Sequence, residues 1–96
     1  MAVTTLVTLN TSAAAASAEF TPTDDFYVAV DAGQVALEAK LPGNDKFYLV
    51  SSVGIDKVSP VVQAAKTIVK VTPYMTGTVY RLAPQTRKVI ANVFKE

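Results

Sequence analysis

The chain has 96 residues, of which 50% are apolar, and its nine basic and eight acidic residues give a formal net charge of +1. This length and composition indicate one folded domain and exclude a disordered chain. There is no cysteine and no histidine, which excludes disulfides, thiol nucleophiles, Ser-His-Asp or Cys-His catalytic arrangements and ordinary zinc sites. The apolar runs are too short to cross a bilayer, so we expect no membrane span.

The first predicted element is a short strand, from Val3 to Leu9, rich in β-branched residues. A period of two would place Val3, Thr5, Val7 and Leu9 on one side of this strand. Residues 10–18 (NTSAAAASA) follow, and we favour a tether over a helix because a helix this short is marginal in isolation.

We therefore divide the chain into an N-terminal arm with its alanine-rich tether, residues 1–18, and a β domain, residues 19–96. We expect the arm to contact another chain or to pack along the edge of the domain. Because termini carry little of a domain's core unless they dock, deleting the arm should leave the domain folded.

Ala16-Ser17-Ala18 resembles the cleavage site of a signal peptide. No lysine or arginine precedes it, and threonines interrupt the apolar segment before it. We therefore expect an uncleaved N-terminus and synthesis in the cytoplasm.

Three further strands are predicted in the middle of the chain, at Phe26–Asp31, Gln34–Leu41 and Lys46–Ser52. Turn residues separate them, with Gly33 in the first turn and Pro42-Gly43-Asn44-Asp45 in the second.

The second of these strands has the clearest alternation in the sequence. Polar and apolar residues take turns along Gln34–Leu41, as in a strand with one face in water. The residues that this pattern directs to the core are Val35, Leu37, Ala39 and Leu41.

Residues 59–71 are ambiguous. Apolar residues at helical spacing, among them Val61 and Ala65, are compatible with a short helix, whereas Thr67–Val71 reads as a β-branched strand that ends before Pro73. We favour the strand, preceded by irregular chain, and leave the helix open as the alternative.

The chain ends with two more predicted strands, Thr78–Leu82 and Val89–Phe94, joined by Ala83-Pro84-Gln85-Thr86. Seven or eight short strands with turns every eight to twelve residues are typical of an all-β protein. We predict a single antiparallel β-sandwich, Ig-like or jelly-roll-like, in which the last strand closes the sandwich with its apolar face.

Few residues offer catalytic or ligand chemistry. The acidic residues are scattered and lack calcium-loop spacing, and the four glycines lie apart rather than in a phosphate-binding loop. We therefore expect no enzyme activity, no metal and no cofactor. The tyrosines at 27, 48, 74 and 80 leave carbohydrate binding open, although the chain has no tryptophan to strengthen it.

Charge is distributed unevenly along the sequence. Residues 1–65 hold three basic and seven acidic residues, a net charge of −4, whereas residues 66–96 hold six basic residues and one acidic residue, a net charge of +5. Solvated strand faces would explain this pattern, and so would contact between acidic and basic surfaces of neighbouring molecules. An overall charge of +1 without a recognition motif argues against nucleic-acid binding.

Several segments together resemble the small β-sandwich virion proteins of tailed phages, the head decoration or cement proteins. The segments are "EFTPTDDFYVAV", "GQVALEAKL" and "TGTVYRL", which span about Phe20 to Leu82. The resemblance implies a structural protein of the virion that stabilises the capsid through protein–protein contacts. A tail or head–tail connector subunit and a carbohydrate-binding or adhesion module are the alternatives.

The interpretation as a virion protein also implies protein partners and a protein–protein interface. The major capsid protein or another virion protein would be the partner, and the chain would form a homo-oligomer without nucleic acid or membrane. An unsatisfied terminal strand can complete a sheet on another chain, and the last strands carry basic residues that can reach outward. The predicted interface residues are Val3, Leu6, Val7, Leu9, Arg81, Arg87 and Lys88.

Overall fold

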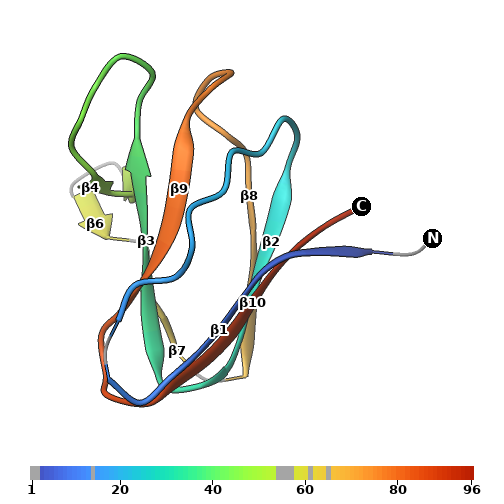
Figure 1. Cartoon of the computed structure of the whole chain (residues 1–96), viewed down its shortest axis with the longest axis vertical. Coiled ribbons are helices and arrows are strands. Elements are labelled where there is room, and N and C mark those ends of the chain that lie inside the picture. The colour runs from blue at the N-terminus through green and yellow to red at the C-terminus, as the bar shows by residue number, and fades with distance from the viewer. Residues whose placement is uncertain (1–2, 14, 54–57, 61, 65) are drawn as a thin grey trace.

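The computed structural model of the chain describes residues 3–13, 15–53, 58–60, 62–64 and 66–96. These residues form strands and no helix (Figure 1). In chain order the strands are β1 (Thr4–Thr11), β2 (Phe26–Ala32), β3 (Gln34–Lys40), β4 (Tyr48–Leu49), β5 (Ser51–Val53), β6 (Val58–Pro60), β7 (Val62–Ala64), β8 (Thr67–Val71), β9 (Val79–Pro84) and β10 (Val89–Lys95).

Two antiparallel sheets make up most of the molecule. Sheet A has the strand order β1–β10–β2–β8, and sheet B is built around β3, which pairs with β4, β7 and β9. β5 and β6 pair only with each other. The predicted all-β fold, an antiparallel sandwich, is confirmed.

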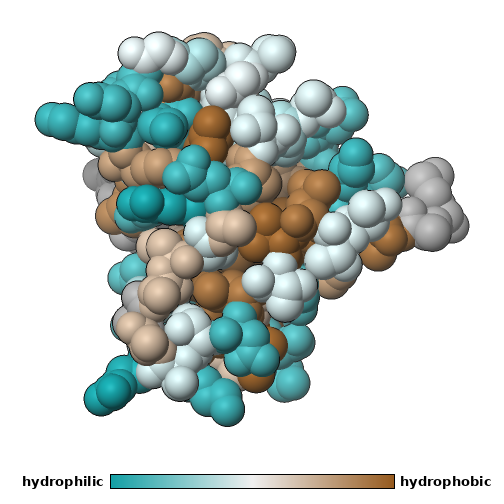
Figure 2. Space-filling view, viewed as in Figure 1, coloured by the Kyte–Doolittle hydropathy of each residue, from teal (hydrophilic) through white to brown (hydrophobic). Residues whose placement is uncertain are grey.

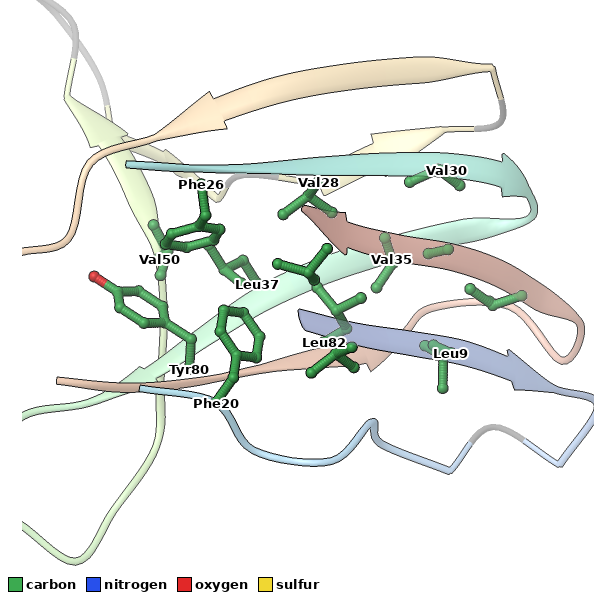
Figure 3. Close-up of a cluster of buried hydrophobic side chains, with 14 of the residues drawn as sticks. Leu9, Phe20, Phe26, Val28, Val30, Val35, Leu37, Val50, Tyr80 and Leu82 are labelled. Carbon is green, nitrogen blue, oxygen red and sulfur yellow. The ribbon is translucent and has the colours of Figure 1, made fainter. Parts of the chain in front are cut away.

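The core lies between sheets A and B, as the close-up of Figure 3 shows. Alternate residues of each strand point to the same side, so one face of each sheet can be wholly apolar. Sheet A contributes Val28 and Val30, and sheet B contributes Val35, Leu37 and Leu82, all of them at most 2% exposed. This is the alternation predicted for β3, and Ala39 follows it.

β10 is the central element of sheet A, because it pairs with β1 on one side and with β2 on the other. Val89, Ala91 and Val93 are fully buried, while the residues between them on the opposite face are half-buried. The last strand therefore closes the sandwich with an apolar face, as predicted.

β1 is an edge strand of sheet A rather than a separate arm. Val7 and Leu9 lie in the core of the same chain, and Leu6 packs against that core. A β-bulge between Thr5 and Val7 changes the alternation, which leaves Val3 exposed although the sequence placed it on the same side as Val7. Of the two expectations for the arm, the structure shows packing along the edge of its own domain. The boundary at residue 18 stays a prediction.

The predicted strand at residues 46–52 is interrupted. The chain forms β4 and β5 around Val50, whose N–H donates to the carbonyl of Leu37 at 2.9 Å and whose side chain is buried. The interruption arises because β4 pairs with β3 whereas β5 pairs with β6.

The described residues of the ambiguous stretch before β8 lie mostly in strands. β8 has the predicted bounds, and the described residues between 59 and 71 contain no helix, but β6 and β7 replace the irregular chain that we expected before β8. Val61 and Ala65 lie outside the described residues.

Substitution of Leu9 by alanine tests whether β1 belongs to the core. We expect Leu9→Ala to lower the free energy of unfolding by about 2–3 kcal/mol, because it removes buried methyl groups and leaves a cavity. The exposed Val3 is the matched control on the same segment, and Val3→Ala should change stability by less than about 0.5 kcal/mol. Equal effects in urea titration would show that β1 is a dispensable arm.

Candidate functional site

An apolar groove lies at one end of the sandwich. Its volume is about 510 Å³, and it is lined by Ala39, Leu41, Tyr48, Leu49, Tyr74 and Met75. Five of these six are exposed although they are large and apolar or aromatic. Among the described residues that line the groove none carries a charge, so these residues offer apolar surface and tyrosine hydroxyls for recognition.

Leu41 reaches the groove because β3 ends just before it. The sequence predicted Leu41 in the core, and that is wrong, since 37% of it is exposed. The reason is the turn at Pro42–Gly43, where the N–H of Asn44 donates to the carbonyl of Leu41 at 3.0 Å and Gly43 has φ of +80°. This turn leads the chain away before Leu41 can be covered.

Tyr74 and Met75 come from the loop between β8 and β9. The backbone N–H of Tyr74 donates to the hydroxyl of Tyr80 at 3.0 Å, and the two rings lie 6.4 Å apart. Tyr80 is fully buried and packs against Phe20 and Phe26, with centroids 6.0 and 5.2 Å away. The groove wall is therefore fixed to the aromatic part of the core.

Burial raises the pKa of Tyr80 above the ordinary value of a tyrosine, because the charged phenolate is costly away from water. The hydrogen bond from the N–H of Tyr74 acts in the opposite direction and offsets only part of this effect. The hydroxyl of Tyr80 is thus a neutral acceptor that orders the loop carrying Tyr74.

The predicted interface residues at the N-terminus do not converge on the groove. Val7 and Leu9 are core residues, whereas Val3 lies beside Tyr27, Ile68 and Phe94 around a separate hollow.

Arg81 is held within its own chain. Its Nε donates to Oε1 of Glu38 at 2.6 Å, and its guanidinium carbon lies 3.9 Å from the centroid of the Phe47 ring. Guanidinium groups pair well with carboxylates and stack on aromatic faces. Arg81 therefore supports sheet B, and the carboxylate that it binds in this structure is an internal one.

Arg87 and Lys88 are exposed in the turn between β9 and β10. This turn packs against the turn that joins β2 and β3, since the N–H of Gln85 donates to the carbonyl of Gln34 at 2.8 Å. A Cβ at Gly33, which has φ of +76°, would collide with the carbonyl oxygen of Lys88. The backbone around the two basic residues is thus fixed, and their side chains face solvent.

Ion pairs within the molecule compensate part of the charge imbalance between residues 1–65 and residues 66–96. The ion pairs found in the described part of the chain join Lys70 to Asp25, at 3.4 Å, and Arg81 to Glu38. Each connects an acid of the first half to a base of the second. Contact between neighbouring molecules is therefore not needed to explain these four charges.

No cluster of three or more acidic side chains that could hold a metal ion occurs among the described residues. The same residues include no helix of the length and hydropathy needed to span a bilayer.

The sequence does not predict the groove. Its alternation places Leu41 in the core, and its tyrosines, Tyr48 and Tyr74 among them, suggest only a carbohydrate platform. In the structure Tyr48 and Tyr74 line the groove, but Tyr80 is buried and Tyr27 lines other hollows, so the four tyrosines form no common platform. The one signal in the sequence was Tyr74-Met75, two large side chains in a loop between strands.

Comparison with known proteins gives a structural likeness and no sequence match. No protein-family model and no curated protein matches the chain. The chain is similar to the solved structure of the Drosophila melanogaster CENP-C cupin domain, with a TM-score of 0.52 and 14% identity, over 91% of this chain and 56% of that chain. It is also similar to D. melanogaster CENP-C bound to CAL1, with a TM-score of 0.53 and 14% identity, over 91% and 59% of the two chains.

This likeness defines the class of fold. The chain spans less than two thirds of the length of the structures that it matches. At 14% identity they show the fold alone, which is an antiparallel sandwich like that of the cupin domain. Since cupins belong to the jelly rolls, the jelly-roll-like form is favoured over the Ig-like form.

The resemblance to phage decoration and cement proteins is wrong. The matching solved structures are CENP-C domains, and no family model or curated protein supports a capsid, tail or connector protein. The carbohydrate-binding alternative finds no support either. The segments that carried the resemblance consist of alternating strands and turn glycines. Such segments recur in many sandwiches and specify the fold rather than the function.

Replacement of Tyr80 by phenylalanine tests its place in the core. In the native protein the folded-state pKa lies above the unfolded one, so its stabilisation is complete below about pH 10 and falls as pH rises above that value. Tyr80→Phe should lose about 1 kcal/mol at neutral pH, because the N–H of Tyr74 loses its acceptor.

The variant should also lose less stability than the native protein between about pH 7.5 and about pH 10.5, measured by urea unfolding. The pKa of Tyr27 is also raised, chiefly by its hydrogen bond to Glu96. Because Tyr27 is present in both proteins, its effect on the pH dependence of stability is the same in each. An identical alkaline loss in the two proteins would contradict the role assigned to Tyr80.

Proposed function

We propose that this chain is a non-catalytic protein-binding domain whose groove holds an extended apolar segment of a partner protein. The observation that carries the proposal is the exposure of Leu41, Tyr48, Leu49, Tyr74 and Met75 around one hollow. Aromatic residues and methionine are enriched in protein interfaces, and exposed apolar surface gathered in one place is typical of binding sites.

The chemistry of the groove supports binding rather than catalysis. Of the described residues that line the groove, Tyr48 and Tyr74 alone are titratable, and the chain has no histidine or cysteine to act as a base or nucleophile. Leu49 and Met75 can instead adapt to apolar side chains of a peptide, since the thioether of methionine is flexible and polarizable.

The similar structures agree with this proposal by analogy. In one of them the D. melanogaster CENP-C protein is bound to another protein, CAL1. Folds are shared among unrelated functions, so the likeness supports a protein partner in general and says nothing about which one.

Selection from a library of random peptides displayed on yeast tests the proposal. We expect the folded domain to enrich peptides that carry several apolar residues, because only such side chains can fill a groove without charged partners. Leu49→Asp should weaken binding of the enriched peptides at least about tenfold, since a carboxylate would be left in an apolar contact. Fluorescence polarisation with synthetic peptides measures this change.

The matched control is Ile68→Asp, which places the same charge on an exposed residue of β8 that does not line the groove. It should bind like the native protein, and melting curves should show that both variants are folded. If no peptide is enriched, or if the two variants bind equally well, the groove is not a peptide site.

A further inference from the structure

The outer edge of β1 is unpaired and uncharged. β1 stands at the end of sheet A, and no other strand in the described part of the chain pairs with its second edge. About half of the backbone N–H and C=O groups of an edge strand point away from its sheet. Figure 2 shows apolar surface on the face of the molecule that β1 crosses in Figure 1.

Two other edges of the main sheets, that of β8 in sheet A and that of β9 in sheet B, differ from β1. The far edge of sheet A is β8, which carries Lys70 and follows Lys66, and lysines on an edge oppose pairing with another strand. In sheet B the edge of β9 is covered, since the N–H groups of Ser17 and Phe20 donate to the carbonyls of Leu82 and Tyr80 at 3.0 and 2.9 Å. Of the three edges formed by β1, β8 and β9, that of β1 lacks both charge and cover, and β1 is longer than β4 and β7, which have two and three residues.

The regular part of β1 is long enough to pair. The bulge lies between Thr5 and Val7, and from Val7 to Thr11 each residue has a successive partner on β10. A bulge by itself discourages pairing at an edge. Here it affects only the beginning of the strand, so that five consecutive residues remain regular.

We propose that this edge pairs with β1 of a second copy of the chain, antiparallel across a two-fold axis at Thr8. In this register Val7 of one copy lies opposite Leu9 of the other, and the two Thr8 residues face each other. Apolar pairs then meet on the core side of the joined sheet and hydroxyl groups on its outer side, which is the favourable arrangement of cross-strand pairs.

The distribution of charged residues along the chain favours a second copy as the partner over a charged segment of another protein. All 17 charged residues of the chain lie after residue 18. Two copies can therefore bring β1 strands together without placing like charges opposite each other. A charged partner segment would find no opposite charge on this strand to steer it.

The expected association is weak. Pairing of five residues buries much less than the roughly 1,200 Å² of a standard stable interface. We expect a dimer that forms reversibly at high protein concentration, and cross-linking is the suitable measurement. The proposal involves the β1 edge alone and does not depend on the groove.

The absence of cysteine from the chain makes the test direct. A single cysteine in place of Thr8 can be cross-linked only to a second copy. With a short bismaleimide we expect Thr8→Cys to give a cross-linked dimer whose yield rises with protein concentration, because the two residues would lie about 5 Å apart.

Two matched variants make the result decisive. Asn10→Cys is exposed on the same strand, but in the proposed register its two copies are separated by four residues along the strands, and Ile68→Cys is exposed on β8. Both should give much less dimer than Thr8→Cys. Equal yields in any of these comparisons would mean random collision or another register and would overturn the proposal.

Thr8→Lys gives a measurement without cross-linking. Two lysines opposite each other repel, so this variant should lower the dimer fraction in analytical ultracentrifugation relative to the native protein. Leu49→Asp should leave the dimer unchanged, which distinguishes failure of this proposal from failure of the groove. An unchanged dimer fraction in Thr8→Lys would overturn pairing through β1.

Discussion

Two turns meet at one end of the sandwich, and the alignment of the sheets depends on their contact. The turn at Gly33 carries the chain from β2 in sheet A to β3 in sheet B, and residues 85–88 carry it back. They are joined by the bond between Gln85 and Gln34, and by a bond of 3.1 Å from the N–H of Gln34 to Oγ1 of Thr86. Only a residue without a side chain fits at Gly33, so the closeness of the two turns is set by sterics as well as by hydrogen bonds.

The two ends of the molecule consequently differ. β3 begins at the fixed turns and ends beside Leu41, so the groove lies at the end opposite the turn contact. At the groove end the core is closed by the loop that carries Tyr74 and Met75, which is attached through one hydrogen bond to Tyr80. A site on a loop at the end of a β-sandwich combines a stable framework with surface that can adapt to a partner.

The sequence predicted the elements of this fold well where one face of a strand is buried. β2, β3 and β10 lie where alternation placed them, because a period of two shows which side of a strand faces the core. β8 lies where its β-branched residues placed it. β1 was found as a strand, but its docking depends on β10, more than 75 residues away in the chain, and no local pattern contains that information.

The candidate site was less predictable for a related reason. Leu41 continues the alternation of β3, so the sequence alone places it in the core. The structure shows that the core ends before Leu41, which leaves its side chain exposed. Tyr48 lies in β4 and Tyr74 in the loop between β8 and β9, and no local sequence pattern shows that they line the same hollow. The phage resemblance failed because the segments that supported it describe strands and turns, which fix a fold and leave its function open.

The central position of β10 bears on synthesis of the chain at the ribosome. β1 and β2 are made early, yet the strand that lies between them consists of residues 89–95. Neither hydrogen-bonded ladder that joins them can form until that segment has emerged, so the β1–β10–β2 part of sheet A assembles in a late step that brings distant parts of the chain together. Throughout elongation the uncharged strand β1 stays without its native neighbour, which makes this segment the one whose protection from premature contacts matters most.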